Sequence, residues 1–259
     1  MRIFAFIILT IFSSSLIADV KVGPVSFSSA KKRAEKYIYH DQNRTFYCRC
    51  DYVFDDTEDL DGDGDVKETM IKPQSCGYIP RNPLTKKRKP NARVSRIEWE
   101  HIVPAAQFGQ HRSCWKRNGK DNARKNCTKT DKAFEIAEGD LHNLVPAVGE
   151  LNADRSDFNF GEIDGKNRAY GQCDFEVSFE ADLVEPTDFV KGNIARIYLY
   201  MVEKHGAKVT PEKLEMFKLW NKIDPIDRWE CERDRRISTI QGNSNHFVSQ
   251  ECINKVSAD

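Results

Sequence analysis

Eight cysteines constrain this chain more than any other feature of its sequence. All of them lie downstream of an N-terminal segment, MRIFAFIILTIFSSSLIA, that has one early basic residue, an apolar centre and small residues near Ala18. That pattern is typical of a secretory signal. An even number of cysteines in an exported chain predicts disulfide bonds, because the compartments outside the cytoplasm are oxidising. The cysteines are Cys48, Cys50, Cys76, Cys114, Cys127, Cys173, Cys231 and Cys252.

A zinc site is the alternative use of these cysteines. Cys48 and Cys50 form a C-x-C pair, but no second pair with the spacing of a zinc ribbon or finger follows it. Disulfide bonds are therefore the favoured interpretation. We predict one pairing, Cys114 with Cys127, which would close a short basic loop.

The sequence predicts one domain after the signal. Residues 1–18 are the expected signal peptide, and residues 19–259 contain neither an internal repeat nor a linker longer than a loop. No later segment is long and apolar enough to cross a bilayer. We therefore expect a soluble monomer that is periplasmic or secreted and does not bind a membrane.

Charge is balanced overall but unevenly distributed. The formal net charge is +0, yet residues 51–65 carry eight acids and no bases, whereas residues 81–129 carry fourteen lysines or arginines and three acids. Solvated faces explain most single charges. A concentrated basic segment in a neutral protein nevertheless indicates a polyanionic partner.

Hydrophobic patterning predicts a mixed α+β fold. A helix is expected over Ser29–Tyr39, and apolar residues alternate with polar ones in three candidate strands. These strands are Thr45–Phe54, Val94–Val103 and Cys173–Glu180. A further helix is expected to begin after Pro146. Three longer helices should follow, over Val190–Val202, from Thr210 as N-cap, and from Asp224 to near Gly242.

The side chains suited to catalysis gather between Glu100 and Asn159. A phosphodiester resists attack because its oxygens repel a nucleophile, so a site that cleaves one needs positive charge at the phosphate and a base for the water. A neutral imidazole such as His101 can serve as that base near neutral pH. Mg²⁺ or Ca²⁺ takes oxygen ligands such as Glu100 and Asn152 offer, and a guanidinium such as Arg124 can hold the phosphate.

The adjacency of Glu100 and His101 raises a geometric difficulty. In a regular strand neighbouring side chains point to opposite faces, so both can serve one site only where the pleating ends. Pro104, three residues on, is compatible with a strand exit there. A solvated surface pair is the other explanation of an adjacent Glu-His sequence.

Five segments together resemble the bacterial endonuclease I family, the periplasmic or secreted nonspecific nucleases that have a ββα-metal site. The resemblance covers nearly the whole mature chain, and the eight cysteines also match the family pattern. The segments are RIEWEHIVPAAQFG, CW…RKNC, DLHNLVPAVGELNADRSDFNF, IARIYLYM and WECERDRRISTIQGNSN.

Carried over position by position, the resemblance implies a one-metal site. His101 would be the general base, and Arg124 would stabilise the phosphate. Glu100 and Asn152 would bind one Mg²⁺, for which Ca²⁺ or Mn²⁺ could substitute, and Glu138 would be an acid near the site. The implied fold is α+β, with a ββα-metal motif packed in a mainly helical, disulfide-stapled single domain.

The implied function is nonspecific endonucleolytic hydrolysis of double- and single-stranded DNA and of RNA, leaving 5′-phosphates. Basic residues between Arg81 and Lys129 would bind phosphates without reading bases. We expect cleavage to fade below about pH 6, where an imidazole with an ordinary pKa protonates. The alternative is a non-catalytic, disulfide-stapled nucleic-acid-binding protein, which needs the basic segment but not Glu100, His101 and Asn152 together.

Three features depart from the family pattern. Ala106 stands where the family commonly has tryptophan, which would thin the packing behind the site, and Ala153 replaces a common glycine. The acidic stretch Asp55–Asp65 is longer than usual, and its D-x-D-G-D-G spacing from Asp59 resembles an EF-hand calcium loop. Its twelfth position is Met70 rather than glutamate, so a solvated turn is favoured.

Overall fold

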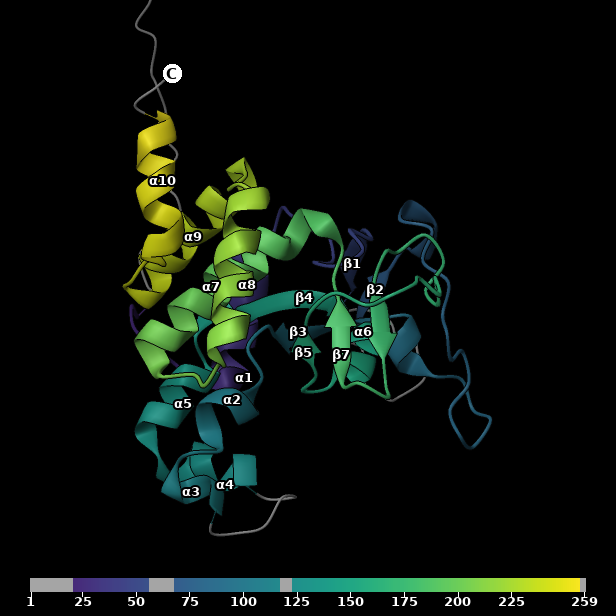
Figure 1. Cartoon of the computed structure of the whole chain (residues 1–259), viewed down its shortest axis with the longest axis horizontal. Helices are drawn as coiled ribbons and strands as arrows, with labels where there is room; N and C mark the ends of the chain where they lie inside the picture. The colour runs from purple at the N-terminus through teal and green to yellow at the C-terminus, as the bar shows by residue number, and fades with distance from the viewer. Residues whose placement is uncertain (1–20, 56–67, 117–122, 257–259) are drawn as a thin grey trace, which may run out of the picture.

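The structure is a computed structural model that describes residues 21–55, 68–116 and 123–256. The predicted signal peptide, residues 1–18, lies outside the described residues, as does most of the acidic stretch that resembles an EF-hand loop. The described residues form the predicted α+β fold, in which helices surround several small sheets (Figure 1). No helix within the described ranges is both long and apolar enough to cross a membrane.

The elements are short up to the last strand, and longer helices follow it. The helices are α1 (Phe27–Arg33), which a π-helical turn (Ala34–Ile38) extends, α2 (Ala105–Gly109), α3 (Ser113–Lys116), α4 (Ala123–Thr130), α5 (Lys132–Glu138), α6 (Gly149–Arg155), α7 (Lys191–His205), α8 (Pro211–Ile223), α9 (Arg228–Gln241) and α10 (His246–Val256). The strands are β1 (Tyr52–Asp55), β2 (Glu68–Ile71), β3 (Ile97–His101), β4 (Leu144–Val148), β5 (Asn159–Phe160), β6 (Glu176–Ser178) and β7 (Leu183–Glu185). Short 3₁₀ turns occupy Pro73–Ser75, Ala92–Val94, Leu141–Asn143 and Asp188–Val190.

Strands β3 and β4 and helix α6 form a ββα unit. The two strands pair antiparallel, with Glu100 opposite Val145 and His101 opposite Leu144. Helix α6 begins directly after β4 and packs against both strands. The remaining strands form a β1–β2 pair and a three-stranded sheet in the order β5-β7-β6.

Two hydrophobic clusters meet at the β3–β4 ladder. The larger cluster includes Ile97 and Val145, and the smaller one joins Leu144 to the helices α1 and α9. Trp99, on β3, packs against both clusters. The ladder is therefore supported by apolar contacts with both parts of the core, which holds the residues at its end in fixed positions.

The three long helices expected in the C-terminal part are present, with one corrected start. Thr210 caps α8, as predicted, by accepting a hydrogen bond from a backbone amide of the first turn. Helix α9 begins at Arg228 rather than near Asp224, because the side chain of Asp227 caps its first turn in the same way. It ends at Gly242, which adopts a left-handed conformation with φ +90°. Helix α10 was not predicted.

The strand predicted over Thr45–Phe54 is wrong in its first half. The chain becomes a strand only at Tyr52, because Arg49 has a φ of +56°, a value that interrupts an extended backbone. Cys48 and Cys50, on either side of Arg49, bond to cysteines far apart in the sequence. The apolar alternation there thus reflects disulfide positions rather than the two faces of a strand.

The helix predicted over Ser29–Tyr39 is present but begins two residues earlier, at Phe27, and the other two predicted strands are too long. Strand β3 is shorter than Val94–Val103, and β6 covers only three residues of the predicted Cys173–Glu180. The helix expected after Pro146 starts at Gly149, because the residues before it pair with β3.

All eight cysteines form disulfide bonds, and the predicted Cys114–Cys127 pairing is confirmed. The four bridges are Cys48–Cys173, Cys50–Cys76, Cys114–Cys127 and Cys231–Cys252. Cys48–Cys173 joins residues 125 positions apart, whereas Cys231–Cys252 joins α9 to α10 across 21 positions. The first bridge therefore closes the largest loop of the chain.

Replacing Cys48 and Cys173 together by serine should lower the free energy of unfolding by about 4–5 kcal/mol, because the unfolded chain regains the freedom of a long loop. The matched replacement of Cys231 and Cys252 should cost about 3 kcal/mol. Unfolding in denaturant measures both values. A larger loss for the Cys231–Cys252 pair would contradict an explanation based on loop length.

Candidate active site

A cleft of about 770 Å³ lies beside β3 and α6 and brings together three of the four predicted site residues. His101 from β3, Arg124 from α4 and Asn152 from α6 all line it. Its other lining residues include Phe27, Glu98, Trp99, Ala106, Trp115 and Arg155. A smaller cavity of about 210 Å³, bordered by Tyr39, Phe189 and Trp229, contains none of the predicted residues.

His101 is held as a single tautomer. Its Nε2 lies 2.7 Å from the backbone oxygen of Glu138. A carbonyl can only accept, so Nε2 carries the proton and donates it. Glu138 is the last residue of α5, where the helix leaves a carbonyl without an internal donor. The ring of Phe27 packs against the imidazole, with 4.6 Å between centroids. Nδ1 is therefore the nitrogen with a lone pair available to accept a proton.

The surroundings of His101 keep it neutral. Burial, and after it the positive charge of Arg124, lowers the pKa of His101 to about 3. Only the neutral imidazole can accept a proton, so it is the form that general base catalysis needs. The expectation that this ring protonates near pH 6 is wrong for the free protein, because it used the pKa of a solvated imidazole.

Glu138 positions Arg124 as well as His101. Its Oε1 accepts a hydrogen bond from Nε of Arg124 at 2.6 Å, and its Oε2 accepts one from the hydroxyl of Thr128 at 2.9 Å. The Glu138 carboxylate is buried, whereas the Arg124 side chain is 45% exposed. The terminal nitrogens of this guanidinium form no hydrogen bond with any residue in the described ranges. They can therefore reach an anion in the cleft.

Asn152 is oriented by a neighbouring carboxylate. Its Nδ2 donates a hydrogen bond to Oε2 of Glu98 at 2.8 Å. Glu98 is held in turn by Arg93, whose Nε lies 2.8 Å from Oε1. Because the amide nitrogen is committed to Glu98, the atom that Asn152 offers to a ligand is its carbonyl oxygen, Oδ1.

Glu100 does not line the cleft with the other three residues. The β3–β4 ladder stays regular through His101, so the expected strand exit comes only after this histidine. Glu100 and His101 consequently point to opposite faces. The carboxylate of Glu100 is 1% exposed, accepts a hydrogen bond from the hydroxyl of Tyr47 at 2.8 Å, and lies 3.3 Å from Nη1 of Arg155. Burial raises the pKa of Glu100 to about 7.

Arg155 ties helix α6 to the end of β3. Its Nη1 donates to the backbone oxygen of His101 at 2.8 Å, and its Nη2 donates to that of Ile102 at 2.5 Å. The same guanidinium neutralises Glu100 and lines the cleft. It thus fixes the backbone on which both Glu100 and His101 sit.

Sequence reasoning did not assign roles to Glu98, Arg155 and Tyr47. Glu98 and Glu100 are at positions i and i+2 of one strand, and Asn152 and Arg155 are at positions i and i+3 of one helix. These spacings place each pair on a common face. That signal was available for these four residues. Tyr47 approaches Glu100 from a segment 53 residues away, and no local pattern indicates such a contact.

Comparison with known proteins agrees with this geometry. The model of the family described as Endonuclease I matches residues 26–252. An extracellular deoxyribonuclease of Aeromonas hydrophila is 41% identical over 228 residues, which cover 88% of this chain and 89% of that protein. A periplasmic deoxyribonuclease of the same organism is 40% identical and covers 88% and 86% of the two chains. Endonuclease-1 of Buchnera aphidicola (from Acyrthosiphon pisum) is 39% identical, covering 84% and 78%.

The chain belongs to the endonuclease I family. The resemblance predicted from the sequence is therefore confirmed, and the chain is a nuclease, a hydrolase of the periplasmic or secreted kind.

The oxygen donors of this endonuclease I family member fit a hard divalent cation. Oε2 of Glu100 is buried and has no hydrogen-bond partner. The other carboxylate oxygen, Oε1, contacts the Tyr47 hydroxyl and Nη1 of Arg155. A buried carboxylate oxygen without a partner is costly unless a cation or water completes it. No group of three histidine, cysteine or acidic side chains is placed to bind a metal among the described residues. Oε2 of Glu100 and Oδ1 of Asn152 are oxygens of the kind that Mg²⁺ takes together with water ligands.

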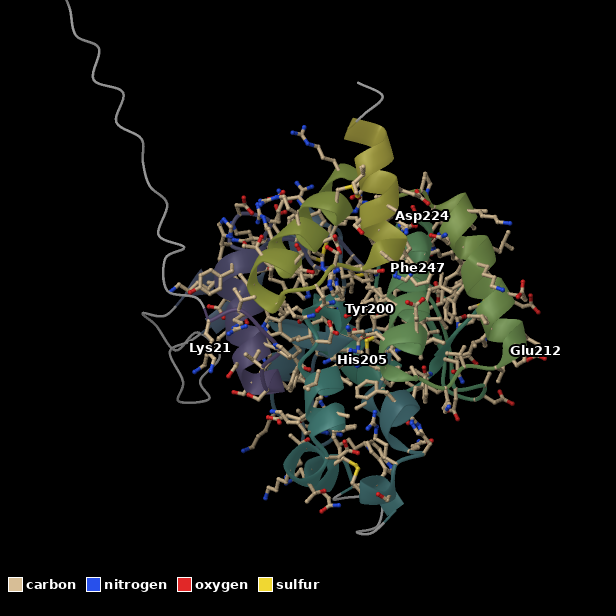
Figure 2. The ribbon with its side chains drawn as sticks, turned by 90° about the vertical axis from the view of Figure 1, so that its left-hand side faces the viewer. Lys21, Tyr200, His205, Glu212, Asp224 and Phe247 are labelled. Atoms are coloured by element: carbon tan, nitrogen blue, oxygen red, sulfur yellow. A yellow bond between two sulfur atoms is a disulfide. The ribbon has the colours of Figure 1, made fainter. Side chains whose placement is uncertain are left out.

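The segment after Glu138 is held by a buried network. The Asp140 carboxylate accepts hydrogen bonds from the hydroxyl of Tyr200 at 2.7 Å, from Nε2 of His205 at 2.7 Å and from Nε2 of Gln241 at 2.9 Å. Figure 2 shows Tyr200 and His205 close together at the C-terminal part of α7. Burial would raise the pKa of Asp140, but the hydrogen bond from His205 and the charges of nearby histidines hold it well below its usual range.

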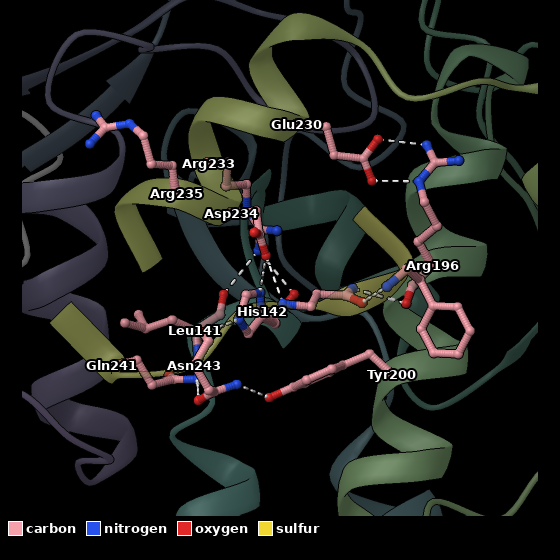
Figure 3. A network of polar contacts seen from close by, with 12 residues as sticks. Leu141, His142, Arg196, Tyr200, Glu230, Arg233, Asp234, Arg235, Gln241 and Asn243 are labelled. Carbon is pink, nitrogen blue, oxygen red and sulfur yellow. Dashed lines mark hydrogen bonds and ion pairs between the residues drawn. The ribbon is translucent and has the colours of Figure 1, made fainter. Parts of the chain in front are cut away.

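Helix α9 completes this network (Figure 3). Nη2 of Arg233 donates to the backbone oxygens of Leu141, His142 and Leu144. His142 donates from Nε2 to the backbone oxygen of Asn243 at 3.0 Å. These contacts fix the path from Glu138 into β4, so His142 has a structural role away from the cleft.

Ala106 lines the cleft. The expectation that its small side chain thins the packing behind the site stays a prediction.

In metal-free protein, the His101 ring should stay neutral, with the proton on Nε2, throughout pH 5–8. Side-chain ¹⁵N chemical shifts report both the charge and the tautomer. Arg124→Gln should raise the pKa of His101, because it removes the second cause of the lowered value. A His101 titration with its midpoint between pH 6 and 7 in the native protein would contradict the buried environment.

Proposed function

We propose that this endonuclease I family member cuts double- and single-stranded DNA, and RNA, at internal phosphodiester bonds with little sequence preference. The observation that carries the proposal is one cleft that holds a neutral imidazole with a free Nδ1 beside a partly exposed guanidinium. Those two groups meet the two needs of phosphodiester hydrolysis, a base for water and positive charge for the phosphate.

His101 acts as the general base in this proposal. A water molecule beside the scissile phosphate gives its proton to Nδ1 of His101, and the oxygen attacks phosphorus. Nε2 keeps its proton throughout because the Glu138 carbonyl holds it. The phosphorus–O3′ bond then breaks and the leaving O3′ takes a proton from a solvent water molecule, which leaves a 5′-phosphate on one product and a 3′-hydroxyl on the other.

Arg124 holds the phosphate and the negative charge that develops on it. Its Nε is anchored on Glu138, so its two terminal nitrogens are free for two parallel hydrogen bonds to phosphate oxygens. Glu138 acts as a positioning residue, since it orients both His101 and Arg124 without contacting the substrate itself.

Glu100 and Asn152 would bind one Mg²⁺, for which Ca²⁺ or Mn²⁺ could substitute. A divalent cation at this position supplies positive charge to the phosphate and the leaving oxygen. The unpartnered Oε2 of Glu100 and the carbonyl oxygen of Asn152 are the atoms of this chain that would bind it. Arg155 favours the ionised form of Glu100, because it places a positive charge 3.3 Å from the carboxylate, but burial outweighs this effect and leaves the pKa of Glu100 raised to about 7.

A plasmid assay tests the base and the cation. Native protein should nick and linearise supercoiled DNA with Mg²⁺ and should stop when EDTA is added. His101→Ala should lower the turnover number by about 100-fold or more, the usual contribution of a general base. His246→Ala is the matched control. It removes a half-exposed histidine that does not line the cleft, so the variant should keep native activity.

Undiminished nicking by His101→Ala would refute the base assignment. Tight binding of DNA by the native protein without any cleavage would instead favour the alternative function, a disulfide-stapled nucleic-acid-binding protein. Cleavage that persists in excess EDTA would remove the role given to Glu100 and Asn152.

A further inference from the structure

The basic segment between Arg81 and Lys129 is not uniform in the structure. Five of its arginines form ion pairs with acids of the same chain. These pairs are Arg81–Asp154, Arg93–Glu98, Arg96–Glu98, Arg112–Asp131 and Arg124–Glu138. Such arginines support the scaffold of the site, and apart from Arg124, which reaches the cleft, they have little capacity left for a second anion.

The unpaired basic residues concentrate instead in one loop, the basic hairpin (Leu84–Pro90). Leu84 and Pro90 form an antiparallel bridge at its base. The four residues at its tip are all exposed, and none forms an ion pair or a side-chain hydrogen bond with any residue in the described ranges. They are Lys86, Lys87, Arg88 and Lys89. Four adjacent positive charges repel one another, so this tip is suited to a partner with a dense negative charge.

The tip has a defined shape. The backbone amide of Thr85 donates to the oxygen of Lys89 at 2.8 Å, and that of Arg88 donates to the oxygen of Thr85 at 2.8 Å. The turn gives Arg88 a φ of +57°, a conformation that glycine or asparagine adopts at lower cost. The chain nevertheless carries an arginine there.

The base of the hairpin is fixed to the helix that carries Asn152. The backbone amides of Arg81 and Asn82 donate to the carboxylate of Glu150 at 3.0 and 2.6 Å, and the guanidinium of Arg81 pairs with Asp154. Glu150 and Asp154 both belong to α6. The orientation of the hairpin is thus set by the same helix that builds one wall of the cleft.

We infer that the basic hairpin is a second phosphate-binding site, which binds the nucleic-acid backbone away from the scissile phosphate. The inference rests on the proposed function, because it assumes the same substrate. None of the four tip residues is among the residues that line the cleft, so the tip would contact phosphates outside it. Figure 1 shows the connection between β2 and β3 reaching outward on the side opposite to α9 and α10.

A charge-removal variant tests this inference. Replacing Lys86, Lys87, Arg88 and Lys89 together by glutamine should weaken binding to a 30-base-pair duplex about tenfold or more near 0.1 M salt. The slope of log affinity against log salt should become shallower by about 3–4, because each lost phosphate contact releases about one counterion fewer. Fluorescence anisotropy in EDTA measures both quantities while the DNA stays intact.

The matched control removes four exposed lysines from the α7–α8 part of the chain. Lys204, Lys208, Lys218 and Lys222 replaced by glutamine give the same change in net charge. This variant should keep the native salt slope. An equal change of slope in both variants would overturn the inference, since it would trace the effect to net charge. An unchanged slope in the hairpin variant would overturn it as well.

Cleavage assays separate this inference from the proposed function. The hairpin variant should show a raised KM for long DNA, and the effect should shrink as the substrate is shortened toward a tetranucleotide that fills only the cleft. Loss of turnover at saturating DNA would argue for a catalytic or folding role and against a distant binding site. If the native protein cleaves nothing, the proposed function fails, and the anisotropy measurement still decides whether the hairpin binds DNA.

Discussion

The site depends on the buried guanidinium of Arg155. This one group pairs with Glu100 and donates hydrogen bonds to two backbone carbonyls at the end of β3, so it joins the last turn of α6 to the strand that carries the imidazole. A buried charge is costly unless it is fully satisfied, and loss of either partner would leave the other charge unpaired in the core. Arg155 consequently holds α6 against the end of β3, where His101 lies.

Within the cleft, opposite electrostatic environments lie close together. His101 is desolvated and next to a positive charge, which keeps it uncharged, whereas Arg124 is partly exposed and keeps two nitrogens for an anion. Glu138 makes this division possible, because its backbone oxygen contacts the imidazole and its carboxylate contacts the guanidinium. Glu138, at the end of a helix, thereby sets both the tautomer of His101 and the position of the Arg124 guanidinium. The buried Asp140 network holds the segment that follows it.

The features that could be predicted from the sequence are those that short, local sequence patterns determine. Helices α7, α8 and α9 were predicted from their apolar periodicity and caps, whereas α10 was not, and the family motifs led to His101, Arg124 and Asn152, which share a cleft. The strand over Thr45–Phe54 was wrong because alternation cannot distinguish a pleated strand from disulfide-bonded cysteines around a left-handed Arg49. The lowered pKa of His101 and the contact of Tyr47 with Glu100 arise from burial and from segments far apart in sequence. The spacing of residue types along a single sequence does not indicate contacts between segments that are so far apart in it.

The disulfide framework has a consequence for the cell that makes this nuclease. Each bridge is worth about 2–4 kcal/mol, and a domain is stable by only about 5–15 kcal/mol in total. In the reducing cytoplasm the four bridges are absent, so the newly made chain lacks the ordered core on which β3 and α6 rest. Export and oxidation then build the cleft on the far side of the membrane, away from the chromosome. Compartment and folding are thereby linked, because the bridges that stabilise the cleft form only where thiols can be oxidised.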